Sequence, residues 1–403
     1  MMRLAVRALV MLLLRPLPQA GAAAGHAGAW PCKVAAPARP FPTNATEVHP
    51  AHISVAMAMG DSISAAFGAR PAVGEATRED LGHPSLPLEY RSLAFSGGEG
   101  AEDSWTLPFF LRHYNASLTG FSDRMTMFQS PSLGYLDEGG DKLNAALSNA
   151  HSWQLMMEVE ELIKQSKKVE RLGERWKLLT LFVGANDLCD GMPDGSGGLF
   201  AACDGNATVR TSIADRYEQN LRSVLTKLRD SFGRIIVQLV PLFSFASVAK
   251  AREGHPWCSF LGIGRRMLNE CACIDKDPSG SSPPGQAQLQ ALDATVAEFN
   301  RRLRRLAGDF NLQRPDFGVL EQSAGRGQPI PDASYLSAID CFHPSAMAHG
   351  QLATTLWNGL FDRTRVLKPF NASASPVCPG ADAAINVGVA GATPDPAEDL
   401  LLV

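Results

Sequence analysis

The stretch Met57-Ala58-Met59-Gly60-Asp61-Ser62 decides the fold and holds the first candidate functional residue. Ile53, Val55 and Met57 alternate with small residues, as in a buried β-strand, and Gly60 ends the apolar run. A serine just past the end of a strand presents its hydroxyl at the rim of a sheet. Taken alone, Gly60-Asp61-Ser62 also fits a simple turn with an Asp or Ser helix cap. The role of Ser62 therefore depends on what else reaches this rim.

Apolar runs alternate with amphipathic segments along the rest of the chain. The runs predict strands, and the segments with helical spacing predict helices. The predicted strands cover about 53–60, 88–96, 176–183, 234–242 and 317–320, and the predicted helices about 104–114, 141–168, 213–232, 286–306 and 345–361. This alternation predicts an α/β fold, a three-layer α/β/α arrangement around a mostly parallel sheet. The aromatic cluster in 105–110 is expected to pack in the core; the wall of an acyl-chain groove is the alternative.

Composition restricts the class of protein. The 403 residues are 45% hydrophobic and 19% charged, with a formal net charge of -4, which argues against broad electrostatic binding to nucleic acid. The basic cluster at 301–305 falls in a predicted helix and is expected to be a solvated face. We expect an irregular lead-in at 25–50, a single domain at 51–378 and a disordered tail at 379–403.

The N-terminal segment is typical of a secretory signal peptide, predicted over residues 1–24. A charged start at Arg3 leads into an apolar core and then into Ala/Gly-rich residues. Arg7 interrupts the apolar core, so a mitochondrial presequence and an uncleaved anchor are alternatives. The C-terminal tail is expected to hold no membrane-spanning segment and no glycolipid-anchor signal.

Two further features indicate the secretory pathway. Four N-x-S/T sequons lie in polar settings and are candidate glycosylation sites: Asn44, Asn115, Asn206 and Asn371. The eight cysteines form no paired C-x-x-C zinc pattern, so we expect disulfides. Candidate pairs are Cys32 with Cys378 and Cys189 with Cys203, although sequence alone leaves the connectivity open. The predicted location is extracellular or in the lumen of the secretory pathway.

Three predicted strands end in unusual residues, and a fourth motif lies near the C-terminus. The strand ends are Gly60-Asp61-Ser62, Gly97-Gly98 and Gly184-Ala185-Asn186-Asp187, and the later motif is Asp340-Cys341-Phe342-His343-Pro344. The carboxyl ends of parallel strands share one edge of a sheet, so the first three motifs are expected to converge there.

Together these motifs offer the parts of an esterase. Ser62 is the candidate nucleophile, and His343, oriented by Asp340, is the candidate base. The backbone N–H groups of Ser62 and Gly98 and the side-chain amide of Asn186 are the candidate oxyanion donors. Taken singly, each residue fits an ordinary turn or cap, and it is their conjunction that favours chemistry.

Competing site types find less support in the sequence. Asp340 and His343 are possible metal ligands, but no matching His/Asp/Glu set accompanies them, and no metal or cofactor is expected. The chain contains no G-x-S-x-G, which argues against an α/β-hydrolase nucleophile elbow. The glycines at 97–100 do not match the G-x-G-x-x-G of dinucleotide-binding folds.

In these motifs, the chain from about 52 to 361 resembles the GDSL/SGNH hydrolase family. That family contributes Ser, Gly, Asn and His from four blocks, which match Ser62, Gly98, Asn186 and His343. The matching motifs narrow the resemblance to the phospholipase B1-like branch; they are Ala58-Met59-Gly60-Asp61-Ser62, the segment 181–189, Cys271-Ala272-Cys273 and Asp340-Cys341-Phe342-His343. The resemblance implies the SGNH hydrolase fold, which is flavodoxin-like.

The resemblance also implies a function. It implies a secreted, calcium-independent serine esterase that forms an acyl-enzyme and hydrolyses acyl esters of phospholipids and lysophospholipids, with a membrane surface as one place where it would meet them. The membrane-associated members have tandem repeats and an anchor, whereas this chain is expected to hold one unit and no anchor; it also carries an insert after Asn186. The alternatives are an SGNH esterase for acetylated carbohydrates or short-chain esters, and a catalytically silent, lipid-binding secreted glycoprotein.

Overall fold

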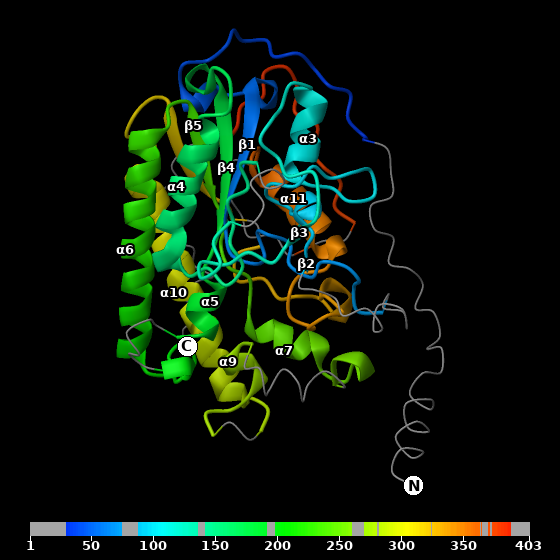
Figure 1. Ribbon diagram of the computed structural model, residues 1–403, viewed down its shortest axis with the longest axis vertical. Coiled ribbons are helices and arrows are strands. Elements are labelled where there is room, and N and C mark those ends of the chain that lie inside the picture. Colours follow the sequence, from blue (N-terminus) through cyan, green and yellow to red (C-terminus); the bar gives the residue numbers. More distant parts are fainter. Residues whose placement is uncertain are drawn as a thin grey trace.

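A four-stranded parallel sheet forms the centre of the molecule in the computed structural model (Figure 1). The structure describes residues 30–74, 88–135, 142–191, 198–259, 270–279, 282–323, 325–362, 364, 370 and 373–387. The strands of the central sheet lie in the order β1 (Ile53–Gly60), β4 (Trp176–Phe182), β5 (Ile235–Leu239) and β6 (Phe317–Glu321). The expected mostly parallel α/β fold is confirmed.

Helices cover both faces of this sheet. One face carries α4 (Leu155–Ser166), α6 (Ala207–Ser231) and α10 (Gln286–Phe310), and the other carries α3 (Leu107–Tyr114) and α11 (Ala346–Gly359) (Figure 1). The shorter helices are α5 (Ala185–Cys189), α7 (Ala246–Arg252) and α9 (Ala272–Asp275). Short 3-10 turns include η2 (Pro50–His52), η3 (Arg91–Leu93) and η4 (Ser152–Gln154). The arrangement is a three-layer sandwich.

The strands are almost wholly apolar because both faces of the sheet are covered. Every residue of β4, β5 and β6 is buried, as expected for parallel strands under helices on both sides. The aromatic cluster at 105–110 lies in the core: Trp105, Phe109 and Phe110 are all buried, and Phe110 contacts Trp357 of α11. Core packing, rather than an open groove wall, therefore describes these rings.

The predicted strand at 88–96 is wrong beyond its first two residues. Only β2 (Leu88–Glu89) is extended, paired with β3 (Thr126–Met127), and η3 follows directly. The cause is Arg91, a fully buried cation that pairs with Glu89 at 2.7 Å and donates to two backbone carbonyls. These contacts pull the chain into a turn, because a buried guanidinium must satisfy its donors.

The predicted helix at 141–168 is also too long, since only 155–166 is α-helical. The described residues before it run beside β1 instead: Ala58 N–H donates to Leu143 O, and Leu147 N–H donates to Gly60 O. Leu143 and Leu147 are buried by this pairing and not by a helix face. Spacing along the sequence does not distinguish the two, and the tertiary pairing prevails.

The ends of the described chain pack against the domain. The lead-in is irregular, but Ala45 and Val48 lie fully buried in the core. The expectation of a disordered tail from 379 is wrong for 379–387: Ile385 and Val387 are each 1% exposed, and Ile385 N–H donates to Val48 O. Residues 388–403 and the predicted signal peptide lie outside the described residues.

All eight cysteines form disulfides, and one of the two candidate pairs is correct. Cys32–Cys378 is present, but Cys189 does not pair with Cys203. Instead the chain forms Cys189–Cys271, Cys203–Cys273 and Cys258–Cys341. The tight Cys271-Ala272-Cys273 motif binds two partners on neighbouring segments.

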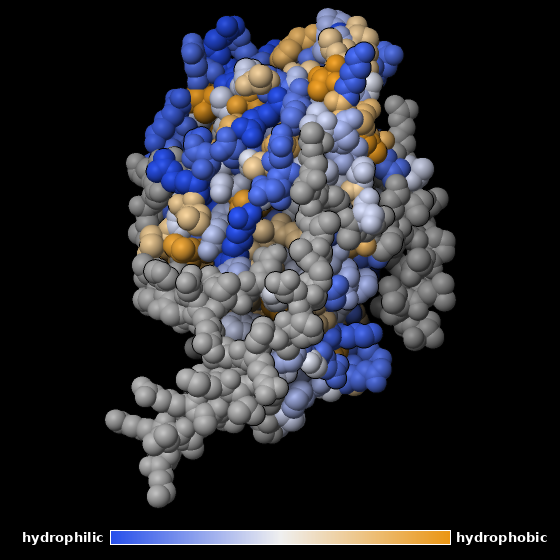
Figure 2. All heavy atoms as spheres, turned by 90° about the vertical axis from the view of Figure 1, so that its right-hand side faces the viewer, coloured by the Kyte–Doolittle hydropathy of each residue, from blue (hydrophilic) through white to orange (hydrophobic). Residues whose placement is uncertain are grey.

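The surface beside α3 and α11 is mixed in character. Where described residues are visible on this face, small hydrophobic areas lie between hydrophilic side chains (Figure 2). Among the helices of the described part, not one combines the length and the apolar content needed to cross a bilayer.

Candidate active site

Ser62 lies in a tight turn at the carboxyl end of β1. Gly60 has a φ of 141°, and a Cβ there would lie 1.8 Å from the carbonyl oxygen of Phe182 in β4, so only glycine fits. Asp61 Oδ1 accepts the N–H of Ile63 at 2.9 Å, which stabilises the turn. The side chain of Ser62 is thereby fixed above the sheet edge while remaining 7% exposed.

The loop 337–345 brings Asp340 and His343 to the same edge. Asp340 Oδ1 accepts the backbone N–H groups of Phe342 and His343, at 2.8 and 3.0 Å. Cys341, which follows Asp340 directly, adopts a left-handed φ of 53°, which is unfavourable for a residue with a Cβ. The disulfide to Cys258 and the two hydrogen bonds to Asp340 hold this turn in place.

The three predicted side chains form one hydrogen-bonded chain. His343 Nε2 lies 2.8 Å from Ser62 Oγ, and His343 Nδ1 lies 2.7 Å from Asp340 Oδ2. Asp340 and His343 are each 7% exposed, and the rings of Phe67 and Phe342 lie edge-on to the imidazole at 4.9 and 5.0 Å. The structure thus brings together Ser62, Asp340 and His343, which are 281 positions apart between the first and the last.

The electrostatics of this chain suit proton transfer. Burial by itself lowers the pKa of His343, but Asp340, and then Glu270 and Asp61, outweigh it, so the pKa lies above its usual value. Burial by itself raises the pKa of Asp340, but His343 and the two backbone N–H groups bring it below its usual value. Asp340 is therefore the anion, and His343 is the group that gains and loses the proton.

Asn186 lies at the carboxyl end of the neighbouring strand. Gly184, with a φ of 124°, follows β4 and starts α5, on which Asn186 is half-buried. Its Nδ2 donates to Ala150 O at 2.9 Å, which fixes the amide and leaves its second N–H for another acceptor. Among the described residues, the backbone N–H of Ser62 has no acceptor.

The prediction for Gly98 is not supported, because its N–H is already engaged. It donates to Ala94 O at 2.8 Å within the turn after η3. The N–H of Gly97 has no acceptor in the described part of the chain. A Cβ on Gly97 would lie 2.8 Å from the Cβ of Ala58 in β1, so this glycine is the one packed against the strand that leads to Ser62.

Sequence analysis missed a buried glutamate behind the nucleophile. Glu158 of α4 is fully buried, and its Oε2 accepts the N–H of Gly60 at 2.7 Å. Burial raises its pKa well above the usual value, and the neighbouring Asp61 raises it further. Burial likewise raises the pKa of Asp61 to about 7. A glutamate in an amphipathic helix carries no distinguishing motif, so the sequence gives no sign of this contact.

Asp187, the residue after Asn186, supports the site from behind. Its two carboxylate oxygens accept the N–H and the hydroxyl of Ser152, at 3.0 and 2.5 Å. This contact joins α5 to η4, the turn that precedes α4. The Asp187 side chain therefore fixes the position of the helix that carries Asn186 and does not face Ser62 as a reactive group.

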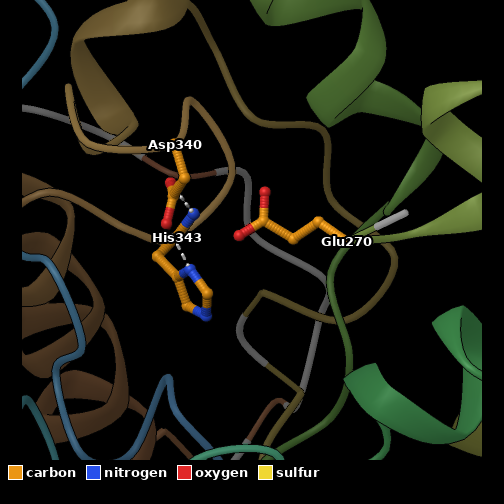
Figure 3. A group of neighbouring side chains, drawn as sticks. All are labelled: Glu270, Asp340 and His343. Atoms are coloured by element: carbon orange, nitrogen blue, oxygen red, sulfur yellow. Dashed lines mark hydrogen bonds and ion pairs between the residues drawn. The ribbon is translucent and has the colours of Figure 1, made fainter. Parts of the chain in front are cut away.

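A third acidic side chain, Glu270, points at the Asp340–His343 pair (Figure 3). One carboxylate oxygen of Glu270, one of Asp340 and one ring nitrogen of His343 all lie within 4.8 Å of one another. Oxygen and imidazole nitrogen are ligands that zinc accepts. Asp340 and His343 are, however, already hydrogen-bonded to each other, and His343 is also hydrogen-bonded to Ser62. We therefore assign the cluster to proton transfer and not to metal binding.

The sequons differ in what their side chains do. Asn44 caps the short helix η1 (Ala45–Glu47) through Oδ1, and Asn206 caps the long helix α6 in the same way. Asn115 instead uses Nδ2, the atom that would carry a glycan, to donate to the carbonyls of Ala51 and Ile53. Asn371 lies outside the described residues.

Comparison with known proteins gives relatives of one kind. The chain is 29% identical to the membrane-associated phospholipase B1 of Homo sapiens over 354 residues, which covers 84% of this chain and 21% of that protein. It is 27% identical to the protein of the same name from Mus musculus, over 82% of this chain and 20% of the relative. The chain thus spans about one fifth of the length of these relatives.

Two solved structures and one family model also match. A phospholipase A1 from Streptomyces albidoflavus matches with a TM-score of 0.35 and 13% identity, covering 75% of this chain and 98% of that one. An extracellular lipase from Streptomyces rimosus matches with a TM-score of 0.31 and 13% identity, over 73% and 94%. The model of the GDSL-like lipase/acylhydrolase family matches residues 57–356. The chain therefore belongs to the GDSL-like lipase/acylhydrolase family.

Proposed function

We propose that this protein is a secreted serine esterase that cleaves acyl esters of phospholipids and lysophospholipids through the triad Ser62, His343 and Asp340. The observation that carries the proposal is the buried chain of hydrogen bonds from Ser62 Oγ through the imidazole to Asp340, at 2.8 and 2.7 Å. A serine hydroxyl is a weak nucleophile until a base accepts its proton, and this chain places such a base in contact with it.

In the proposed mechanism, Ser62 attacks the ester carbonyl while His343 Nε2 takes the hydroxyl proton. Asp340 holds Nδ1–H and stabilises the imidazolium that forms. The imidazolium then protonates the departing alcohol, leaving Ser62 acylated. A water molecule, deprotonated by the same imidazole, attacks the acyl carbonyl and releases the fatty acid, which restores the free serine.

The negative charge on the carbonyl oxygen needs donors that are already in place. Asn186 Nδ2 and the backbone N–H of Ser62 are the proposed donors, together with the N–H of Gly97 in place of Gly98. Each of these residues offers an N–H group that has no acceptor among the described residues. The backbone N–H of Gly98, in contrast, already donates to Ala94 O. Fixed donors of this kind stabilise the transition state without reorganising.

A lipid substrate is supported by the surroundings of the imidazole and by the relatives. The rings of Phe67 and Phe342 contact His343, and Phe128 contacts Phe67 at 5.8 Å between ring centroids. Apolar rings beside a nucleophile suit an acyl chain better than an acetyl group on a sugar. The matched relatives are named as phospholipases B1.

Secretion is supported by the four disulfides, since disulfides form and persist in oxidising compartments. Asn206 is the best candidate for a glycan, because it is exposed and its Nδ2 is not used by the helix cap. Asn44 is the second candidate, because it is half-buried and its cap likewise uses Oδ1 and not Nδ2. Asn115 is the poorest of the described sequons, because a glycan on Nδ2 would remove one of its two hydrogen bonds.

The direct test is Ser62→Ala, compared with the wild-type protein on phosphatidylcholine, lysophosphatidylcholine and p-nitrophenyl esters of graded chain length. We expect hydrolysis to fall by roughly 10⁴- to 10⁶-fold with unchanged secretion and thermal stability. A fluorophosphonate probe should label the wild type and not the variant. Retained hydrolysis in the folded variant would refute the triad, and a strong preference for acetate esters would refute the lipid substrate. A wild type that resists the probe would instead identify a lipid-binding protein without catalysis.

A further inference from the structure

The charge around His343 comes from more than its partner in the triad. Four titratable groups act on the imidazole from the elements packed around it: Asp340 from its own loop, Asp61 from the turn after β1, Glu270 from the segment before α9, and His349 from α11. Three are acids, and His349, whose burial lowers its pKa to about 3, stays neutral. Asp61 is fully buried with its pKa raised to about 7, so its charge at neutral pH is partial. Glu270 is half-buried, and one of its carboxylate oxygens lies within 4.8 Å of Asp340 and His343.

The position of Glu270 is fixed by covalent and ionic contacts. Its neighbour Cys271 is fully buried and forms the disulfide with Cys189, three residues beyond Asn186 on α5. The N–H of Cys271 also donates to Asp275, which pairs with the buried Arg252 at 2.6 Å. The backbone next to Glu270 is thereby anchored, its carboxylate lies within 4.8 Å of the pair, and Figure 3 shows the side chain reaching across to Asp340 and His343.

We propose that Glu270 is a positioning residue for catalysis, whose carboxylate supports the positive charge that His343 acquires when it takes the proton of Ser62. The inference rests on the proposed function and extends it. A buried imidazole pays a desolvation penalty on protonation, and the single charge of Asp340 offsets only part of it. A second carboxylate at this distance stabilises the imidazolium, and with it the transition state, without touching the substrate.

This role has a signature that a merely structural role lacks. If Glu270 acts through charge, Glu270→Gln lowers the pKa of His343, because one of the acids that raise it is lost. The acidic limb of the pH profile then moves to lower pH by on the order of one unit. The plateau also falls, by up to about tenfold, because one pKa unit corresponds to a factor of ten in the stability of the imidazolium. If Glu270 had only a structural role, its replacement would loosen the segment before α9. The plateau of the pH profile would then fall, and the acidic limb would stay at the same pH.

The experiment measures the second-order rate of fluorophosphonate labelling of Ser62 against pH, in wild type, Glu270→Gln and Glu270→Asp. Glu253→Gln is the matched control, since it removes an exposed glutamate at the end of α7. We expect the limb shift in Glu270→Gln, a smaller one in Glu270→Asp and none in the control, with thermal unfolding confirming that all variants fold.

The possible outcomes separate the two proposals. If the probe labels the wild type and the acidic limb lies at the same pH in wild type and Glu270→Gln, the role of Glu270 is overturned. The proposed triad would still stand. A reduced plateau without a limb shift would overturn the role of Glu270 as well. No labelling of the wild type at any pH would refute the proposed function itself.

Discussion

The two halves of the candidate site are held in place by different means. The sheet-anchored half, Ser62 and Asn186, lies at the ends of β1 and β4 and is fixed by backbone geometry and buried hydrogen bonds. The disulfide-anchored half, Asp340, His343 and Glu270, lies on irregular segments next to Cys341 and Cys271. A sheet edge positions a nucleophile through many weak contacts, whereas loops need a few strong ones. The turn that carries Ser62 should therefore tolerate reduction of the protein better than the base does, whereas α5 carries both Asn186 and the disulfide-bonded Cys189.

After Ser62→Ala, the largest effect is expected in the sheet-anchored half, from Asn186→Ala. Removing one fixed oxyanion donor should lower kcat on the order of 100-fold, with little change in KM. The lost bond to Ala150 should cost only about 1 kcal/mol of the free energy of unfolding. Steady-state kinetics and thermal unfolding measure the two effects. A kcat within twofold of wild type would remove Asn186 from the proposed oxyanion hole.

A smaller effect is expected when the support of the nucleophile turn is removed. Glu158→Leu leaves the buried N–H of Gly60 without an acceptor, which costs about 1–3 kcal/mol and lets the turn shift. We expect kcat to fall about tenfold, because small displacements of a reacting group are costly. Glu158→Gln keeps an acceptor and should restore most of the rate, which distinguishes a positioning role from simple packing.

The difference in unfolding free energy between wild type and Glu158→Gln should depend on pH. Burial raises the pKa of Glu158 in the folded protein, so its contribution to stability is present at low pH and is lost as pH rises from the unfolded value through the folded one. Unfolding free energies of wild type and Glu158→Gln should therefore diverge as pH rises, in favour of the variant. A constant difference between them across pH 4 to 8 would contradict the raised pKa.

The smallest effect on rate is expected in the disulfide-anchored half, from the double variant Cys258→Ser/Cys341→Ser. The disulfide closes a loop with a sequence separation of 83, so its loss should cost about 2–5 kcal/mol of stability. Well below the midpoint of unfolding, we expect kcat to fall only a few-fold, because the hydrogen bonds of Asp340 still shape the turn. On warming, esterase activity should be lost before global unfolding, as followed by tryptophan fluorescence. Simultaneous loss of both would show that the base loop does not depend on this disulfide separately.

Much of this architecture could be predicted because it is encoded locally. The four strands of the sheet lie in apolar runs, and β1 and β4 lead through Gly60 and Gly184 to Ser62 and Asn186. The pair Asp340 and His343 was placed with them because its spacing suits one tight loop. The structure brings all four residues to one edge of the sheet.

What could not be predicted depends on contacts between distant segments. The residues from 143 to 147 have helical spacing, but their hydrogen bonds to β1 keep them out of a helix. The partners of Cys189 and Cys203 lie 82 and 70 positions away, so only the folded chain identifies them. Glu158 and Glu270 look like ordinary charged residues until burial and proximity give them a role.

The disulfide between Cys32 and Cys378 also has a consequence for the order of events during synthesis. Its two cysteines are 346 positions apart, whereas the other three pairs are separated by 70 to 83 positions. At 5 to 20 residues per second, Cys378 joins the growing chain roughly 20 to 70 s after Cys32. Throughout that interval Cys32 is a thiol without its native partner, while the other three pairs become available to each other. This disulfide can close only after both members of every other pair have joined the chain, and a chain stalled before Cys378 would carry Cys32 as an unpaired thiol.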